Sequence, residues 1–242
     1  MFCFRDTSDG VGVAFTDRRG GVSEPPYASL NLGTATADDP ASVARNYDLV
    51  GSALGIEPGW VARMAQVHGA EVAVVRRPPD ADRLPAVDAM VTDRPGLALS
   101  VRVADCVPVL LADAASGVVG CAHAGRAGLA GGVVPRTVEA MRGLGASRLQ
   151  AWIGPYVCGG CYEVPAQMRA DVTAVVPEAD STTTWGTPAL DIGAGVEAQL
   201  RAAGCTVVEV PRRCTREDPD LYSHRRDGDR AGRSAGVVWR VP

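Results

Sequence analysis

The chain has 242 residues, of which 46% are hydrophobic and 21% charged, so it holds enough apolar sequence for a substantial core. All 24 cationic side chains are arginine, against 28 acidic residues, which excludes chemistry that depends on a Walker A, Schiff-base or kinase-type lysine. The net charge of −4, without a long basic run, argues against a nucleic-acid surface but leaves a local anion site built from arginine open.

The sequence also indicates where the protein works. Residues 1–6 include charged side chains and no long apolar run, so we expect no secretory signal. The most apolar region, residues 97–134, is interrupted by charged residues such as Arg102 and Asp113 and does not form a membrane span. Seven unevenly spaced cysteines are not typical of a disulfide framework. We therefore expect a cytoplasmic protein with reduced thiols and no membrane or nucleic-acid partner.

In chain order, the first expected elements are a strand over residues 12–15 and a helix that opens at Asp38-Asp39-Pro40 and stops at Gly55. In that helix Val43, Val50 and Leu54 recur at helical spacing. Short apolar runs bounded by turns then predict strands over 61–67, 72–75, 89–92, 97–103, 107–112 and 118–122. Helices are expected over 133–144, 165–176 and 192–203, with strands over 149–153, 207–210 and 235–239.

This order of elements indicates the fold class. Strands outnumber helices too heavily for a simple βαβ alternation, and no repeat or shift in composition marks a domain boundary. We expect one α/β (α+β) domain over residues 1–242, with antiparallel or mixed sheets covered by helices.

Three residues of metal-ligand type stand at the ends of predicted strands. His68 lies in a glycine turn, Cys106 lies between two apolar runs, and His123 ends a strand before a glycine-bracketed turn. Imidazole and thiolate suit zinc, and three protein ligands leave a fourth tetrahedral position for water or substrate. The alternatives are that these are satisfied turn and core residues, or that Cys106 is a nucleophile with either histidine as its base.

Other polar residues offer supporting roles. Asp105 and Glu71 are the carboxylates near the trio in sequence and are candidate proton shuttles. Cys158 and Cys161 have the spacing of half a zinc ribbon or of a redox motif. Because the later cysteines, 205 and 214, do not form a second such pair, we interpret Cys158 and Cys161 as structural. Arginines in glycine turns could hold phosphate, although such residues are usually solvated or paired; they are Arg18, Arg19, Arg225, Arg226 and Arg233.

Motifs along nearly the whole chain together resemble one family, known as laccase-domain or multicopper polyphenol oxidoreductase proteins and also as purine nucleoside phosphorylases or peptidoglycan-editing factors. The motifs are Thr16–Ser23, Ser29–Gly33, Gln66–Gly69, Asp88–Thr92, Ala104–Val109, His123–Gly125, Gly154–Pro155, Cys161–Val164, Cys214–Thr215, Tyr222–Gly228 and Gly232–Arg233. The resemblance implies a layered α/β/β/α domain and a zinc site formed by His68, Cys106 and His123.

The resemblance further implies phosphorolysis of adenosine, inosine, guanosine or methylthioadenosine to the free base and ribose 1-phosphate, and deamination of adenosine to inosine. Purine nucleosides and phosphate would then be the ligands. Two alternatives are a zinc- or Cys106-dependent amide hydrolase acting on a peptidoglycan precursor, and a catalytically reduced protein that acts through a partner. Three histidines are too few for a multicopper oxidase, although copper could occupy the single site adventitiously.

The chain departs from the family at two positions where arginine is usual. Tyr47 follows Asn46 in the first helix, and Ala127 follows Arg126 where the family commonly reads tryptophan then arginine. The neighbouring Arg45 and Arg126 are candidates to replace the lost charges. With Arg18, they form the predicted phosphate-binding set.

Overall fold

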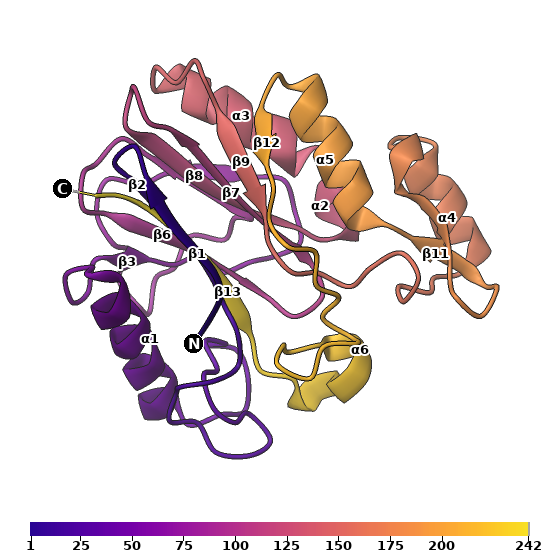
Figure 1. Ribbon diagram of the computed structural model, residues 1–242, viewed down its shortest axis with the longest axis horizontal. Helices are drawn as coiled ribbons and strands as arrows, with labels where there is room; N and C mark the ends of the chain where they lie inside the picture. Colours follow the sequence, from indigo (N-terminus) through magenta and orange to yellow (C-terminus); the bar gives the residue numbers. More distant parts are fainter. Residues whose placement is uncertain (242) are drawn as a thin grey trace.

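Two mixed sheets form the centre of the computed structural model, which describes residues 1–241 (Figure 1). The first has the strand order β1 (Phe2–Ser8), β2 (Val11–Thr16), β13 (Ser234–Arg240), β6 (Ala98–Val103) and β3 (Val61–Ala62). The second has the order β12 (Thr206–Val208), β9 (Gln150–Ile153), β7 (Val107–Asp113), β8 (Val118–Ala124), β5 (Ala89–Thr92) and β4 (Val72–Val74). Neighbours are antiparallel except β3 with β6, β4 with β5 and β9 with β12.

Side-chain alternation along the strands shows how the two sheets stack. In β2, Val13 and Phe15 belong to the apolar cluster between the sheets, while Ala14 joins the cluster on the opposite face. In β7, Leu110 faces the first sheet, whereas Val109 and Leu111 join the cluster beneath the helices. Both faces of each sheet are therefore covered.

Helices form the outer layers. Helix α1 (Pro40–Leu54) covers the first sheet, and α2 (Arg126–Ala130), α3 (Val133–Gly143) and α5 (Ile192–Ala202) cover the second (Figure 1). At the side of the molecule lie α4 (Ala166–Thr173), a 3₁₀ turn (Pro177–Ala179) and the pair β10 (Asp180–Thr182) and β11 (Pro188–Leu190). The short α6 (His224–Asp227) and a 3₁₀ turn (Gly228–Arg230) precede β13. The predicted α/β/β/α layering is confirmed.

Helix α1 forms where its end signals predict it. The Asp39 carboxylate accepts hydrogen bonds from the backbone amides of Ala41 and Ser42, and Pro40 occupies the first turn. Gly55 ends the helix in a left-handed conformation with φ of 71°. Its buried residues include Val43, Val50 and Leu54, as the spacing predicts.

Two sequence predictions need correction. The strand expected over 61–67 ends at Ala62. Further along β6, the backbone of Arg102 pairs with the amide side chain of Gln66 rather than with the backbone of residues 63–67. This side chain donates to the Arg102 carbonyl at 2.8 Å and accepts from the Arg102 amide at 2.9 Å. The hydrophobic pattern also did not predict β1, α2 or α6, because β1 is an edge strand and α2 and α6 are very short helices. Within residues 1–241, no helix is both long and apolar enough to cross a bilayer.

Candidate metal centre

Three potential ligands from separate parts of the chain meet beside the second sheet. His68 lies in the loop after β3, Cys106 lies between β6 and β7, and His123 lies near the end of β8. Their ligand atoms all lie within 4.8 Å of one another. His68 is exposed, Cys106 is half-buried and the His123 side chain is buried, so the trio has one solvent-facing side. The arrangement that the sequence predicts is thus brought together by the fold.

The Asp88 carboxylate organises two of these residues. It accepts hydrogen bonds from the backbone amides of Val67, His68 and Gly69 at 3.1, 3.0 and 2.7 Å. It also lies 2.7 Å from Nδ1 of His123, which leaves Nε2 of that ring free to bind a metal ion. Burial raises the pKa of the Asp88 carboxyl, but the hydrogen bonds from His123 and the loop amides outweigh it and hold this pKa below its usual value.

Two loop residues adopt backbone conformations that favour glycine. His68 has φ of 60°, and Asp105, which precedes Cys106, has φ of 95°. Residues other than glycine hold such conformations only where the surroundings enforce them. The Asp88 carboxylate does so for His68. Asp105 is held by its own carboxylate, which accepts from Thr215 Oγ1 and from the Arg225 amide, both at 2.6 Å.

The donor set fits a zinc ion. Two imidazole nitrogens and one thiolate are zinc ligands, and three of them leave a fourth position open. Gly125 keeps this space clear, because a Cβ there would lie 3.0 Å from His68 Cδ2 and 3.1 Å from Cys106 Sγ. Other ions bind similar ligands, so the geometry defines a candidate metal centre and leaves the ion to be identified by experiment.

Burial sets the protonation of the two inner ligands. It lowers the pKa of His123 below its usual value, so the ring is neutral at pH 7 and suited to bind a metal. Burial also raises the pKa of the Cys106 thiol to about 12, with a further contribution from the Asp105 carboxylate. The metal-free thiol is therefore protonated at neutral pH, which disfavours Cys106 as a free nucleophile, and a bound cation must displace its proton.

A cavity of about 680 Å³ opens over the trio, a size typical of small-molecule pockets. Four arginines line it: Arg102, Arg126, Arg225 and Arg233. The guanidinium of Arg225 stacks on the ring of Tyr162, another lining residue, at 4.5 Å from its centroid. The cavity thus combines a metal-ligand cluster with strong positive charge, which favours an anionic ligand beside the cluster.

The fold places one of the three predicted phosphate-binding arginines in the cavity and the other two outside it. Arg126 lines the cavity, as does Ala127, so a guanidinium is retained next to the replaced position. Arg18 lies outside the lining, where its guanidinium packs over Tyr222 and donates to the Ala28 carbonyl. Arg45 is exposed on α1, also outside the lining.

The two candidate proton shuttles are also placed differently. Asp105 lines the cavity, but both of its oxygens already accept hydrogen bonds, which favours a positioning role. Glu71 lies outside the lining, is largely exposed and forms an ion pair with Arg136 at 3.0 Å.

Sequence reasoning missed two contributors to the site. The sequence presents Asp88 only as part of a motif, and Arg102 only as a charge within an apolar region. Arg225 and Arg233 lie in glycine turns, which makes them possible phosphate ligands, but the predicted phosphate-binding set includes neither of them. For Asp88 the available signal was an acidic residue at the start of a strongly apolar strand, because a carboxylate there is buried and needs partners.

Comparisons with known proteins place the chain among close relatives. The family model described as multi-copper polyphenol oxidoreductase laccase matches residues 12–241. A Streptomyces coelicolor protein named purine nucleoside phosphorylase is 55% identical over 97% of this chain and 98% of its own length. A Streptomyces griseus protein of the same name is 57% identical over 93% of each chain. The crystal structure of YlmD from Geobacillus stearothermophilus is similar with a TM-score of 0.88 at 31% identity, covering 98% of this chain and 94% of that one.

Proposed function

This chain belongs to the multi-copper polyphenol oxidoreductase laccase family, and we propose that it is a zinc-dependent purine nucleoside phosphorylase. The names of its relatives support this activity. The observation that carries the proposal is the cavity of about 680 Å³, in which the His68, Cys106 and His123 cluster faces four arginines. Phosphorolysis needs a place for an uncharged nucleoside and a place for a phosphate anion side by side, and this cavity offers both.

His68, Cys106 and His123 would hold the zinc ion, which would supply a Lewis acid next to the substrate. Asp88 positions two of these ligands by fixing the His68 loop and the His123 ring. Through its hydrogen bonds to Thr215 and the Arg225 amide, Asp105 positions the chain segment that carries Arg225. These buried carboxylates preorganise the site before substrate binds.

The arginines would bind phosphate and hold it against C1′ of the ribose. Among the described residues, the guanidinium groups of Arg126 and Arg225 form no hydrogen bond or ion pair with the rest of the chain, so they are available to an anion. In the reaction, a phosphate oxygen bonds to C1′ as the bond from C1′ to the purine nitrogen breaks. The bonding electrons leave with the base, which then takes up a proton. The arginine charges keep the phosphate oriented for this attack.

Adenosine deamination is a second candidate activity, because zinc sites with histidine and cysteine ligands also occur in deaminases. Such a reaction requires a carboxylate that carries protons without binding the metal. Within residues 1–241, Asp105 is the only carboxylate that lines the cavity, and both of its oxygens are occupied. We therefore expect phosphorolysis to be faster than deamination.

Product analysis tests the proposal. Adenosine, inosine, guanosine and methylthioadenosine are each incubated with the zinc-loaded protein, with and without phosphate. The expected products are free base and ribose 1-phosphate, formed only with phosphate, and adenine in excess over inosine from adenosine. Base release that does not need phosphate, or no turnover of any of the four, would show the proposal to be wrong. Cleavage of a peptidoglycan-precursor amide would instead support the hydrolase.

Removing either free guanidinium should weaken phosphate binding. We expect Arg126→Ala and Arg225→Ala each to raise the KM for phosphate by about 10- to 100-fold, as loss of a hydrogen bond to a charged group implies. The KM for the nucleoside should change much less. Initial rates at varied phosphate measure the effect, and Arg148→Ala, an exposed arginine outside the cavity, is the matched control. An unchanged KM in both variants would contradict this assignment.

A further inference from the structure

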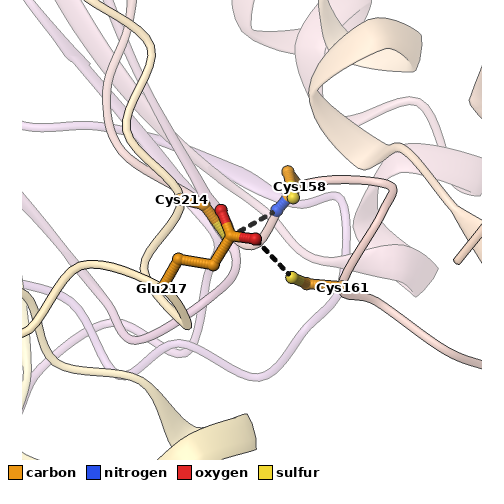
Figure 2. A group of neighbouring side chains, drawn as sticks. All are labelled: Cys158, Cys161, Cys214 and Glu217. Carbon is orange, nitrogen blue, oxygen red and sulfur yellow. Dashed lines mark hydrogen bonds between the residues drawn. The ribbon is translucent and has the colours of Figure 1, made fainter. Parts of the chain in front are cut away.

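A second group of metal-ligand side chains lies outside the cavity. Cys158 and Cys161 follow β9, and Cys214 and Glu217 lie between β12 and α6. One ligand atom from each of the four residues lies within 4.8 Å of all the others. Figure 2 shows the four side chains pointing toward a common centre from two separate chain segments. The group includes no residue of the trio described above.

Each segment presents its two ligands from a tight turn. In the first turn, the amides of Cys161 and Tyr162 donate to the Cys158 carbonyl at 2.9 and 3.0 Å. In the second, the Asp218 amide donates to the Cys214 carbonyl at 3.0 Å. Both pairs are three residues apart, and such turns place the two side chains on the same side, as in zinc-binding turns with the Cys-x-x-Cys spacing.

The first turn has little room for larger residues. A Cβ on Gly159 would lie 2.5 Å from Ser181 Oγ and 2.9 Å from Asp191 Cβ. Glycine therefore allows the turn to approach β10 and the start of α5 closely, which holds the two cysteines in place.

The two turns are fastened to each other around the group. Tyr156 and Cys214 form a parallel β-bridge, and the Thr215 amide donates to the Tyr156 carbonyl at 3.0 Å. The Cys158 amide donates to the Cys214 sulfur at 3.4 Å, and the Cys161 thiol donates to Glu217 Oε1 at 3.4 Å (Figure 2). A backbone amide that donates to a cysteine sulfur is the kind of contact that supports a metal-bound thiolate.

We propose that Cys158, Cys161, Cys214 and Glu217 bind a structural zinc ion. Three sulfurs and one carboxylate oxygen are zinc ligands, and a tetrahedron with bonds of about 2.3 Å has edges of about 3.8 Å, so only small shifts close the site. Four protein donors leave no open position, which makes the site structural rather than catalytic. Zinc binding displaces the thiol protons to solvent. Glu217 is exposed, which gives the ion a path of entry.

The ion would stabilise one wall of the cavity. It would link chain segments 56 residues apart. Tyr162, which follows Cys161, lines the cavity and carries the stacked Arg225. Thr215, which follows Cys214, donates to Asp105 beside the trio. The alternative is a disulfide between two of these three cysteines. A disulfide would involve only two of the sulfurs and would not explain why the third sulfur and Glu217 lie beside them. All of the described cysteines are free thiols.

Zinc content tests the proposal independently of any substrate. Protein purified without chelators is expected to hold about two zinc ions per chain, falling to about one in the Cys158→Ser/Cys161→Ser double variant and to about one in Cys106→Ala. After exchange with cobalt(II), the double variant should keep about a quarter of the sulfur-to-cobalt absorption, since only one of four ligating thiolates remains. Cys205→Ala, which lies in neither group, is the matched control.

The Glu217→Gln variant covers the case in which the double variant does not fold. It changes one exposed side chain, and we expect it to lose one of the two zinc ions to a chelator at least about tenfold faster than the wild type. A wild-type protein with a single zinc, all of it lost in Cys106→Ala, would overturn the proposal. A disulfide between two of the three cysteines in freshly purified protein would also overturn it, as would unchanged zinc release from Glu217→Gln.

Discussion

Replacing Cys106 with alanine is expected to lower kcat/KM for phosphorolysis by at least about a thousandfold, equivalent to about 4 kcal/mol of transition-state stabilisation. The thiolate is the only anionic ligand of the trio, so its loss removes both a bond to the ion and the charge that balances it. Bound metal at this site should fall together with activity. Metal analysis and initial rates on the same preparation measure the two effects.

The Cys106 experiment needs a control that separates loss of metal from loss of structure. Cys205→Ala also removes a thiol, from a buried residue that belongs to neither ligand group, and should keep metal content and activity. Cys106→Ala should keep the circular dichroism spectrum of the wild type, because the cavity over the trio is already open. If Cys106→Ala keeps its metal and its activity, the trio is not the metal centre.

Asp88→Asn is expected to weaken metal binding by about 10- to 100-fold. The carboxylate accepts from three loop amides and contacts His123 Nδ1, and an asparagine amide supplies one acceptor oxygen in place of two. At least one of these partly buried loop amides then loses its partner, so the metal-free protein should also be less stable by about 1–3 kcal/mol. Chelator competition and denaturant unfolding measure the two changes.

If Asp88 acts by positioning the metal ligands, Asp88→Asn should change zinc binding and not nucleoside binding. The nucleoside KM should change little at saturating zinc, while the zinc concentration needed for half-maximal activity rises. Thr92→Val is a matched control, since Thr92 is a buried polar residue at the other end of β5. Wild-type zinc affinity in Asp88→Asn would show that the His68 loop and the His123 ring do not depend on this carboxylate.

Most of the layering could be predicted from the sequence, because it follows from local signals. Asp39 and Gly55 are cap residues, and the apolar residues of α1 recur at helical spacing, so its ends were predictable. The apolar runs of β7 and β8 indicated buried strands. What could not be predicted depends on contacts distant in sequence. The Gln66 side chain pairs with the backbone of Arg102, 36 residues away, in place of the expected strand, and no local pattern reveals this contact.

The candidate site likewise has residues that the sequence could predict and residues that only the fold reveals. His68, Cys106 and His123 could be singled out because histidine is rare in this chain and each of the three residues stands at the end of a predicted strand. Arginine is common, so its residue type carries little information, and only the fold separates Arg225, in the cavity, from Arg45, outside it. The Cys158 group was missed because its second half pairs a cysteine with a glutamate rather than with another cysteine.

We propose that the metal at the trio serves nucleoside phosphorolysis. The most direct test removes metal from the protein, adds zinc back in steps, and follows bound zinc and phosphate-dependent adenine release from adenosine together. Activity is expected to return in proportion to the zinc bound at the trio, which is the zinc that the wild type binds in excess of Cys106→Ala, and to reach a plateau once that site is full. Full adenine release by the metal-free protein, or none from the zinc-loaded wild type, would contradict it.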